Sequence, residues 1–233
     1  MDDGSSAAAS AGDDRSPARA QESYAWPLIA LVLVILPQVL VPASDREGPP
    51  LLVPLIESVV VLVLLAVAAR PGPVPRAARP LVLTLSGVLI GANTVAAARL
   101  MIVILRHTPH GEAPPTVTQL IVGAGIVLST NIVTFGIFYW QIDGGGPDGR
   151  ASAAGVYPDF QFPQTDTNGL APPGWRPRFP DHLYVAFTNV VAFSPTDTMP
   201  LTHRVKGLMA VQSLISVCVI GVVLSRVINI LPP

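Results

Sequence analysis

The chain has 233 residues, of which half are apolar and only 12% are charged, and its formal net charge is −1 at pH 7. A soluble domain carries roughly twice this fraction of charged residues, so the composition argues against a soluble protein. The balanced charge argues against a nucleic-acid partner. The single cysteine, Cys218, excludes a disulfide framework and a zinc cluster built from cysteines.

The apolar residues gather in blocks of about 20 or more, the length that an α-helix needs to cross the hydrocarbon layer of a bilayer. We therefore predict an all-α integral membrane protein with about five transmembrane helices. The expected spanning helices cover residues 24–43, 51–69, 80–105, 116–141 and 201–231. The first four form a four-helix transmembrane region, 24–142. Residues 1–23, rich in Ala, Ser, Gly and Asp, are predicted to be a disordered tail because they cannot bury enough apolar surface to fold.

A polar segment, residues 143–180, separates the fourth expected helix from the rest of the chain. It is dense in Gly, Pro and Asp and has no helical or strand periodicity, so we predict a long loop. Next comes an amphipathic run, Asp181–Phe193, which is too short to span a bilayer. Asp181 is expected to cap the N-terminus of this short helix.

Residues 181–233 are predicted to form one module that consists of a half-helix, a Ser-Pro-Thr-Asp turn and a final long helix. This order is typical of a re-entrant pore loop, whose non-helical backbone is tolerated at membrane depth only inside protein or beside a water-filled cavity. Such a turn presents oxygen atoms to ions, and a ring of Asp197 carboxylates would favour cations. The candidate pore-lining residues are Thr188, Asn189, Ser194, Thr196, Asp197 and Thr198. Gly221, in the final helix, is a candidate hinge.

The run Tyr184–Asn189 resembles the pore-helix pattern of two-helix potassium channels. Asp197, followed by Pro200, resembles the Asp and Pro that come after their selectivity filter. On this register the filter positions are residues 192–197, where the channel family has Thr-Val-Gly-Tyr-Gly-Asp. Both filter glycines are missing here, and these glycines allow backbone conformations that are costly for other residues. The resemblance implies a tetrameric pore for monovalent cations, without implying potassium selectivity.

Three further stretches are similar to a family of uncharacterised bacterial membrane proteins with five helices, which are commonly described as ion-channel-like. These stretches are Phe138–Pro147, Pro158–Gln164 and Ala192–Leu201. The resemblance extends from about Pro27 to the end of the chain. It implies a pore-loop-like C-terminal module and assigns no chemistry to individual residues.

Two functions stay open at this point. One is a cation-favouring ion channel, and the other is a non-conducting membrane scaffold or binding protein that uses residues 143–180 as its partner surface. In the second case the Ser-Pro-Thr-Asp turn is only an interfacial turn, with Thr196 or Asp197 capping the last helix. The sequence contains no nucleophile elbow, phosphate loop, metalloprotease helix or kinase signature, so we expect no enzyme, cofactor or bound metal.

Two charged residues, Glu57 and Arg99, lie inside expected spanning helices, where a charge must face protein or water. Antiparallel packing of the second and third helices places them at the same side of the membrane, so we predict an ion pair. Two alternatives stay open: Arg99 extends to the interface by itself, or the two residues take part in an ion or proton relay.

Three arginines in residues 70–79 place this loop and the N-terminus in the cytoplasm by the positive-inside rule. Lys206 is the only lysine among 14 basic residues, a bias typical of GC-rich bacterial genomes, so we expect a multi-pass protein of the bacterial plasma (inner) membrane. The segment 143–180 then also lies inside, whereas a potassium channel carries its filter loop outside. Either the pore loop is inverted, as in ionotropic glutamate receptors, or the arginine rule fails here.

Overall fold

The computed structural model describes residues 22–40, 52–70, 78–105, 115–151, 157–166, 171–194 and 197–230, and these are mostly helical. The long helices are α1 (Ala25–Leu40), α2 (Leu52–Ala68), α3 (Ala78–Leu105), α4 (Val117–Ile142) and α8 (His203–Ile230). The shorter elements are the 3-10 turn η2 (Asp143–Gly145), α5 (Gly146–Ala151), α6 (Pro163–Asp166) and α7 (Phe179–Val191). Two short strands, β1 (Phe160–Gln161) and β2 (Met199–Pro200), pair in antiparallel register.

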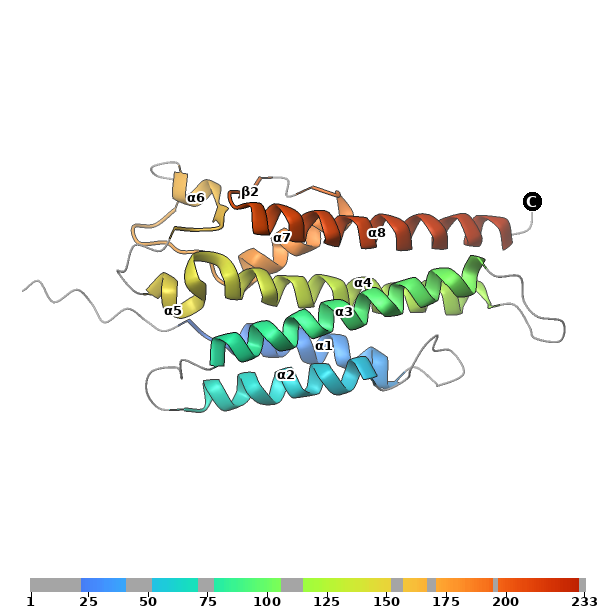
Figure 1. Ribbon diagram of the computed structural model, residues 1–233, viewed down its shortest axis with the longest axis horizontal. Helices are drawn as coiled ribbons and strands as arrows, with labels where there is room; N and C mark the ends of the chain where they lie inside the picture. Colours follow the sequence, from blue (N-terminus) through green and yellow to red (C-terminus); the bar gives the residue numbers. More distant parts are fainter. Residues whose placement is uncertain are drawn as a thin grey trace, which may run out of the picture.

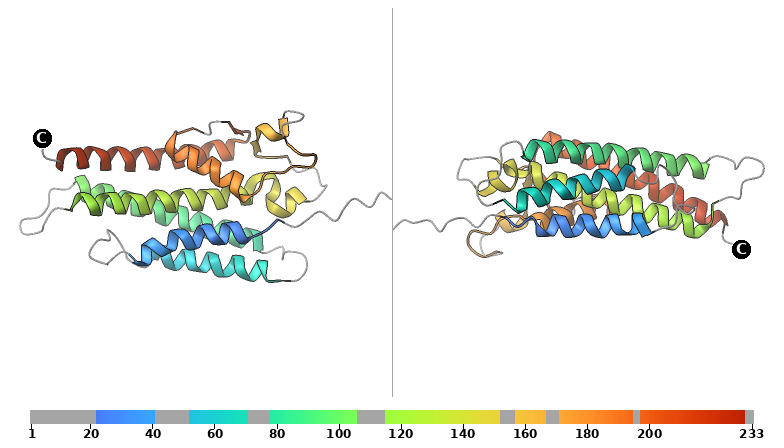
Figure 2. Two further views of the ribbon diagram at one scale, coloured as in Figure 1. Left: turned by 180° about the vertical axis from the view of Figure 1, so that it is seen from behind. Right: turned by 90° about the horizontal axis from the view of Figure 1, so that it is seen from below.

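The long helices lie side by side along one axis and form a bundle (Figures 1 and 2). Successive helices from α1 to α4 alternate in direction, and α8 packs against both α3 and α4. We call the end of the bundle at which α4 ends and α8 begins the cap end. The elements η2, α5 and α6 and the β1–β2 pair gather there, so the described parts of the polar segment 143–180 are folded onto the end of the bundle.

The outer surface of the bundle is apolar. Three helices, α3, α4 and α8, are long and apolar enough to cross a membrane, and α1 and α2 are apolar helices of 16 and 17 residues. Leucines such as Leu33, Leu62 and Leu214 are more than half exposed. Moving large apolar side chains out of water lowers the free energy, so a bundle with such side chains on its surface is expected to lie in lipid. The fold is consistent with an all-α membrane protein.

The central element of the bundle is α4. The most apolar stretch of α4 is 56% buried inside the protein, compared with 28% for α3 and 33% for α8. One face of α4 packs against α1 and α3, and its Val133, Ile137 and Trp140 share a core cluster with residues of α1, α2 and α3. The other face contributes Phe135 and Tyr139 to a core shared with α3, α7 and α8. Both halves of the hydrophobic core therefore depend on the position of α4.

Successive glycines reverse the chain directly after α4. Gly144, Gly145 and Gly146 have φ angles of 54°, 83° and 81°, in the left-handed region that is costly for other residues. A Cβ atom on Gly146 would lie 2.9 Å from the carbonyl oxygen of Gln141, so a side chain does not fit there. The reversal brings Arg150 back under the end of α4, where it donates hydrogen bonds to exposed helix carbonyls.

The short helix α7 starts at the cap end, and the chain returns to that end through β2 before α8 begins (Figure 1). Near the end of α7, Asn189 contacts α8 between Met209 and Ser213. These positions lie roughly 9 to 15 Å from the start of α8, which is roughly 42 Å long at 1.5 Å per residue. The helix α7 therefore stops well before the opposite end of the bundle.

The helices predicted from the sequence are found within about one turn of their expected bounds. Two expectations about helix caps are wrong. Asp181 lies inside α7 rather than before it. Its Oδ2 accepts the backbone N–H of the N-cap residue Arg178 at 2.7 Å, so Asp181 has the role of the N3 residue in a capping box. Asp197 does not cap the last helix, because α8 begins at His203, directly after Thr202. Thr196 and residues 1–21 lie outside the described residues.

The crossing of α4 and α7 requires a glycine. A Cβ atom on Gly136 would lie 3.2 Å from Cα of Leu183 in α7. We expect Gly136→Val to push α7 away from α4 and to destabilise the fold by about 1–3 kcal/mol, because overpacking forces the backbone to shift. The measurement is the thermal unfolding temperature of the purified protein in detergent. Gly125→Val, on an exposed part of the same helix with open space around it, is the control; equal effects of the two changes would contradict the prediction.

Candidate functional site: the half-helix α7 and its polar anchors

The candidate site consists of α7 and the described part of the segment that returns to the cap end, residues 192–194 and 197–202. Two groups of polar side chains hold it. The first, which we call the cap cluster, comprises Glu22, Trp140, Asp143, Arg150, Asp159, His182, Thr202 and Arg204. The second, which we call the inner cluster, comprises Tyr139, Asn189, Gln212 and Ser213.

Asp143, the first residue after α4, is the centre of the cap cluster and is almost completely buried. Its Oδ1 accepts the backbone N–H groups of Asp159, at 2.8 Å, and Phe160, at 3.2 Å. Its Oδ2 lies 2.9 Å from Nε2 of His182, which belongs to α7. A single carboxylate thus joins the end of α4 to the start of β1 and to the half-helix.

Both ring nitrogens of His182 lie within hydrogen-bond distance of a partner. Its Nδ1 lies 2.9 Å from the carbonyl oxygen of Arg178, which can only accept a hydrogen bond, so Nδ1 carries a proton. Its Nε2 faces the carboxylate of Asp143, which also accepts when it is ionised. His182 and Asp143 therefore form a buried hydrogen-bonded pair.

The electrostatics of Asp143, which lies beyond the end of the spanning helix α4, agree with this pair. Burial raises the pKa of the Asp143 carboxyl, but the hydrogen bond and charge of His182, the amide of Asp159 and the charge of Arg150 together hold this pKa below its ordinary value. Asp143 is therefore ionised at neutral pH. The three groups that lower its pKa come from separate parts of the chain, so their positions depend on one another.

Glu22 connects the segment before α1 to the same cluster. Its Oε1 accepts the indole N–H of Trp140 at 2.6 Å and the backbone N–H of Phe179, the first residue of α7, at 3.0 Å. Its Oε2 pairs with Arg150 at 2.9 Å. The sequence placed Glu22 in the tail, whereas the structure makes it a direct anchor for the start of the half-helix.

Asp159 fixes the start of α8. Asp159 is fully buried. The exposed side chain of Arg204 donates two hydrogen bonds to its carboxylate, from Nε to Oδ1 at 2.8 Å and from Nη2 to Oδ2 at 2.5 Å. The hydroxyl of Thr202 donates a third bond to Oδ1 at 2.6 Å. Bidentate pairing of this kind fixes orientation as well as distance. The segment that returns from α7 is therefore anchored at its far end.

The inner cluster lies deeper in the bundle, where α7 meets α4 and α8. The side-chain oxygen of Gln212 accepts bonds from the Tyr139 hydroxyl and from Nδ2 of Asn189, each at 2.8 Å. Its side-chain nitrogen donates to the carbonyl of Ala186 at 3.1 Å, and Ser213 donates to Oδ1 of Asn189 at 3.0 Å. Partners on three helices thus satisfy these buried polar groups, which would otherwise be costly.

The structure divides the candidate pore-lining residues into two sets. Thr188 and Asn189 are buried inside the chain, where the Thr188 hydroxyl donates to the carbonyl of Val185 at 3.0 Å. Ser194 and Asp197 are exposed, as is Gly221 in α8. Thr198 is buried next to Asp197. In the single chain, therefore, Thr188 and Asn189 face other helices of the bundle.

The predicted ion pair between Glu57 and Arg99 is not formed. The Oε2 atom of Glu57 accepts a hydrogen bond of 2.7 Å from the side chain of Gln38 in α1. Arg99 is exposed on the surface of α3, and its charge pairs with none of the described carboxylates. Helix rotation decides the outcome, because equal depth in the membrane does not ensure that two side chains share a face.

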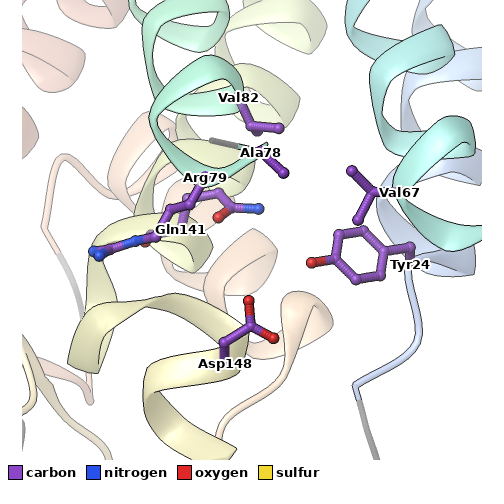
Figure 3. A pocket seen from close by; sticks show the side chains of 7 residues that line it. All are labelled: Tyr24, Val67, Ala78, Arg79, Val82, Gln141 and Asp148. Carbon is purple, nitrogen blue, oxygen red and sulfur yellow. The ribbon is translucent and has the colours of Figure 1, made fainter. Parts of the chain in front are cut away.

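A small cavity lies at the cap end beside the cap cluster. Figure 3 shows its lining residues, among which Arg79 donates from Nε to the carbonyl of Gln141 at 3.1 Å. Burial, supported by the nearby negative charges of Asp148 and Glu22, raises the pKa of the Tyr24 hydroxyl to about 12. The cavity measures about 10 Å³, roughly the space for one water molecule. It therefore cannot hold an organic cofactor.

Sequence patterns alone assign no individual role to Asp143, Asp159, His182 or Gln212. The contacts of Asp143 and Asp159 are tertiary, so no local pattern shows them. Gln212 carried a usable signal, since a lone amide inside an apolar spanning helix requires a partner. His182 carried none, because a histidine in a short amphipathic run is common.

The fold and the site define a class: a helical bundle with an apolar outer surface, in which a half-helix and the start of the last long helix are anchored at one end. Comparison with models of protein families, with curated proteins and with solved structures finds no match for this chain.

Removing the charge of Asp143 tests the cap cluster. We expect Asp143→Asn to destabilise the protein by about 3 kcal/mol, because it leaves His182 without its carboxylate in a buried site. The pKa of Asp143 is lowered in the folded state, so the contribution of its charge is present above the unfolded-state pKa and is lost as the pH falls through the folded-state value. The measurement is thermal unfolding in detergent at neutral and at acidic pH.

Asp148→Asn, which changes an exposed carboxylate of the same segment, is the matched control. The stability difference between the wild type and Asp143→Asn should narrow at acidic pH. A loss of stability no larger than that of the control, or one that is independent of pH, would show that the charge of Asp143 does not hold the cap together.

Proposed function

We propose that this chain is one subunit of an oligomeric, cation-favouring ion-conducting membrane protein. In this proposal α1–α4 and α8 span the bilayer, and α7 is a re-entrant half-helix. The observation that carries it is the path of the chain: α7 enters from the cap end, stops beside the first part of α8 and returns to the same end. A half-helix followed by a returning segment and a spanning helix is the arrangement of a pore loop.

The exposed turn after α7 supports an oligomer. Phe193 and Ser194, which follow the end of α7 partway along the bundle, are exposed in the single chain. Asp197 is exposed as well. Lipid cannot satisfy the backbone groups of such a turn, and it is a costly environment for a carboxylate. Other copies of the chain around a water-filled path would cover the turn and hydrate the carboxylate together.

The backbone of the turn adds a second argument. Phe193 has a φ angle of 54°, which is unusual for a bulky residue, and it occupies a filter position in the register with potassium channels. Strained backbone of this kind is concentrated at functional sites. The C-terminal end of α7 also carries partial negative charge from its free carbonyl groups, which favours a cation nearby. Ser194, Thr196 and Asp197 are the ion-facing residues in this proposal.

The orientation belongs to the same proposal. Basic residues gather at the cap end: Arg70, Arg79, Arg150, Arg176, Arg178, Arg204 and Lys206. By the positive-inside rule this end faces the cytoplasm, so the half-helix enters from the cytoplasmic side of a bacterial plasma membrane. That corresponds to an inverted pore loop.

A non-conducting scaffold or binding protein is the second candidate, and two observations favour it. The cap cluster holds the described parts of the segment 143–180 against the bundle, and Tyr157 in this segment is 89% exposed. In addition, Thr188 and Asn189 serve inside the chain instead of facing a pore. A rigid surface with an exposed aromatic side chain suits a protein partner. Conduction is what separates the two candidates.

The charge of Asp197 is the test of conduction. We expect liposomes that contain the purified protein to pass monovalent cations, and we expect Asp197→Asn to bring the ratio of cation to anion flux towards one, because a ring of carboxylates would be lost. Asp148→Asn, at the cap end and away from the turn, should leave the ratio unchanged. If the wild type shows no flux in vesicles that contain folded, oligomeric protein, the scaffold is the better reading.

The proximity of the turns can be measured separately. In a Cys218→Ser background, we expect Ser194→Cys to form disulfide-linked dimers on mild oxidation, because the turns of neighbouring copies meet around the proposed path. Leu62→Cys, on the exposed face of α2, is the control and should stay monomeric. A monomeric mass in native mass spectrometry together with no cross-link at position 194 would overturn the proposed assembly.

A further inference from the structure

A second polar site lies inside the bundle, apart from α7, where α1, α2 and α4 meet. The side-chain amide of Gln38 donates to Oε2 of Glu57 at 2.7 Å and lies 3.2 Å from both the Thr130 hydroxyl and the carbonyl of Val34. All three side chains are buried, and Glu57 is only 1% exposed. Thr130 lies near the middle of α4, so the site lies deep in the bundle.

Some buried polar atoms in and near this site have no hydrogen-bond partner. The Oε1 atom of Glu57 has no hydrogen-bond partner among the described residues. The same is true of the buried hydroxyl of Thr134, one turn further along the same face of α4. An ionised carboxylate would accept several hydrogen bonds, whereas this one has a strong bond at only one of its two oxygens.

No positive charge faces Glu57 from the helices around it. On α1, α3 and α4 the ionisable side chains are Arg79, Arg99 and Tyr139. Arg79 bonds to the carbonyl of Gln141 at the cap end, Arg99 is exposed, and Tyr139 donates to Gln212. A carboxylate that is buried among apolar helices without a counter-ion is costly enough for the neutral acid to be preferred.

We propose that Gln38, Glu57 and Thr130 form a proton-binding site inside the helical bundle, in which Glu57 is held as the neutral carboxylic acid. Gln38 supplies the hydrogen bond that orients the carboxyl group, and Thr130, 3.2 Å from the same amide, joins α4 to the site. The ligand is a single exchangeable proton. The site uses no residue of the half-helix, so it stands whether or not the chain conducts ions.

An apolar groove provides access to this region. It has a volume of about 410 Å³ and lies between α1, α4 and α7, lined by residues that include Val34, Ser129, Val133 and Phe187. Val34 accepts a bond from Gln38, and Ser129 adjoins Thr130, so the groove borders the proposed site. A hydrophobic reagent dissolved in the detergent or lipid phase can therefore reach Val34 and Ser129, which adjoin the site.

Dicyclohexylcarbodiimide tests the proposal, because it reacts with a protonated carboxyl group in an apolar setting. The acid proton passes to one nitrogen, the carboxyl oxygen adds to the central carbon, and rearrangement gives a stable acylurea from which no atom has been lost. We expect peptide mass spectrometry of the treated full-length protein to find this adduct on Glu57, with a yield that falls as the pH rises. The exposed Asp148 and Asp197, in the same sample, should stay unmodified at neutral pH.

Two further measurements make the test decisive. Glu57→Gln should lose the infrared carbonyl band of a protonated acid, and the wild-type labelling should be the same in sodium chloride and choline chloride of equal ionic strength. Protection by sodium would overturn the proton in favour of a cation site. The absence of an adduct at every pH, combined with a carbonyl band that Glu57→Gln does not change, would show that Glu57 is not held as an acid. If Glu57→Gln does not fold, the pH profile of wild-type labelling still decides between these outcomes.

Discussion

The buried carboxylate of Asp143 is the constraint on which the functional end of this protein depends. It accepts backbone amides of Asp159 and Phe160 through one oxygen and contacts His182 of the half-helix through the other. The glycines after α4 permit the reversal that brings Arg150 back beside this carboxylate. Each of these contacts crosses from one element to another, so the position of α7 depends on tertiary structure that forms only after the whole chain has folded.

The half-helix is held at both ends by different chemistry. At its start, charged groups of the cap cluster lie at the end of the bundle, where Glu22 and Asp143 contact its first turns. Further along it, neutral amides and hydroxyls around Gln212 replace charges. This change from charged to neutral groups suits a membrane protein, because charged pairs become more costly with depth while hydrogen bonds between neutral groups cost less. A helix anchored in this way has little freedom to move as a whole, which suits a pre-formed site better than a mobile arm.

Apolar block length predicts the long helices and a short amphipathic run predicts α7, because polar or Pro-rich residues separate these segments. The pairing of side chains could not be predicted from the sequence. The Glu57–Arg99 pair was inferred from equal depth, but helix rotation turned Glu57 towards Gln38 and left Arg99 on the surface. Likewise, Thr188 and Asn189 carry suitable oxygens for a pore, yet their position on α7 faces α8 and the inside of the bundle. Sequence periodicity gives the faces of a helix, and only packing decides which neighbour each face meets.

The polar groups of the bundle differ in how completely they are satisfied, and this difference separates structural from functional roles. Asp159 accepts three bonds in addition to its backbone contacts, and Gln212 bonds to partners on α4 and α7. The hydrogen bonds of these two side chains stabilise the fold. Glu57, by contrast, keeps a buried oxygen without a partner, and Ser194 lies exposed at the end of a half-helix. Buried or lipid-facing groups that are left incomplete cost stability. In the proposals made above, a bound proton would supply what is missing at Glu57, and a second copy of the chain would cover Ser194.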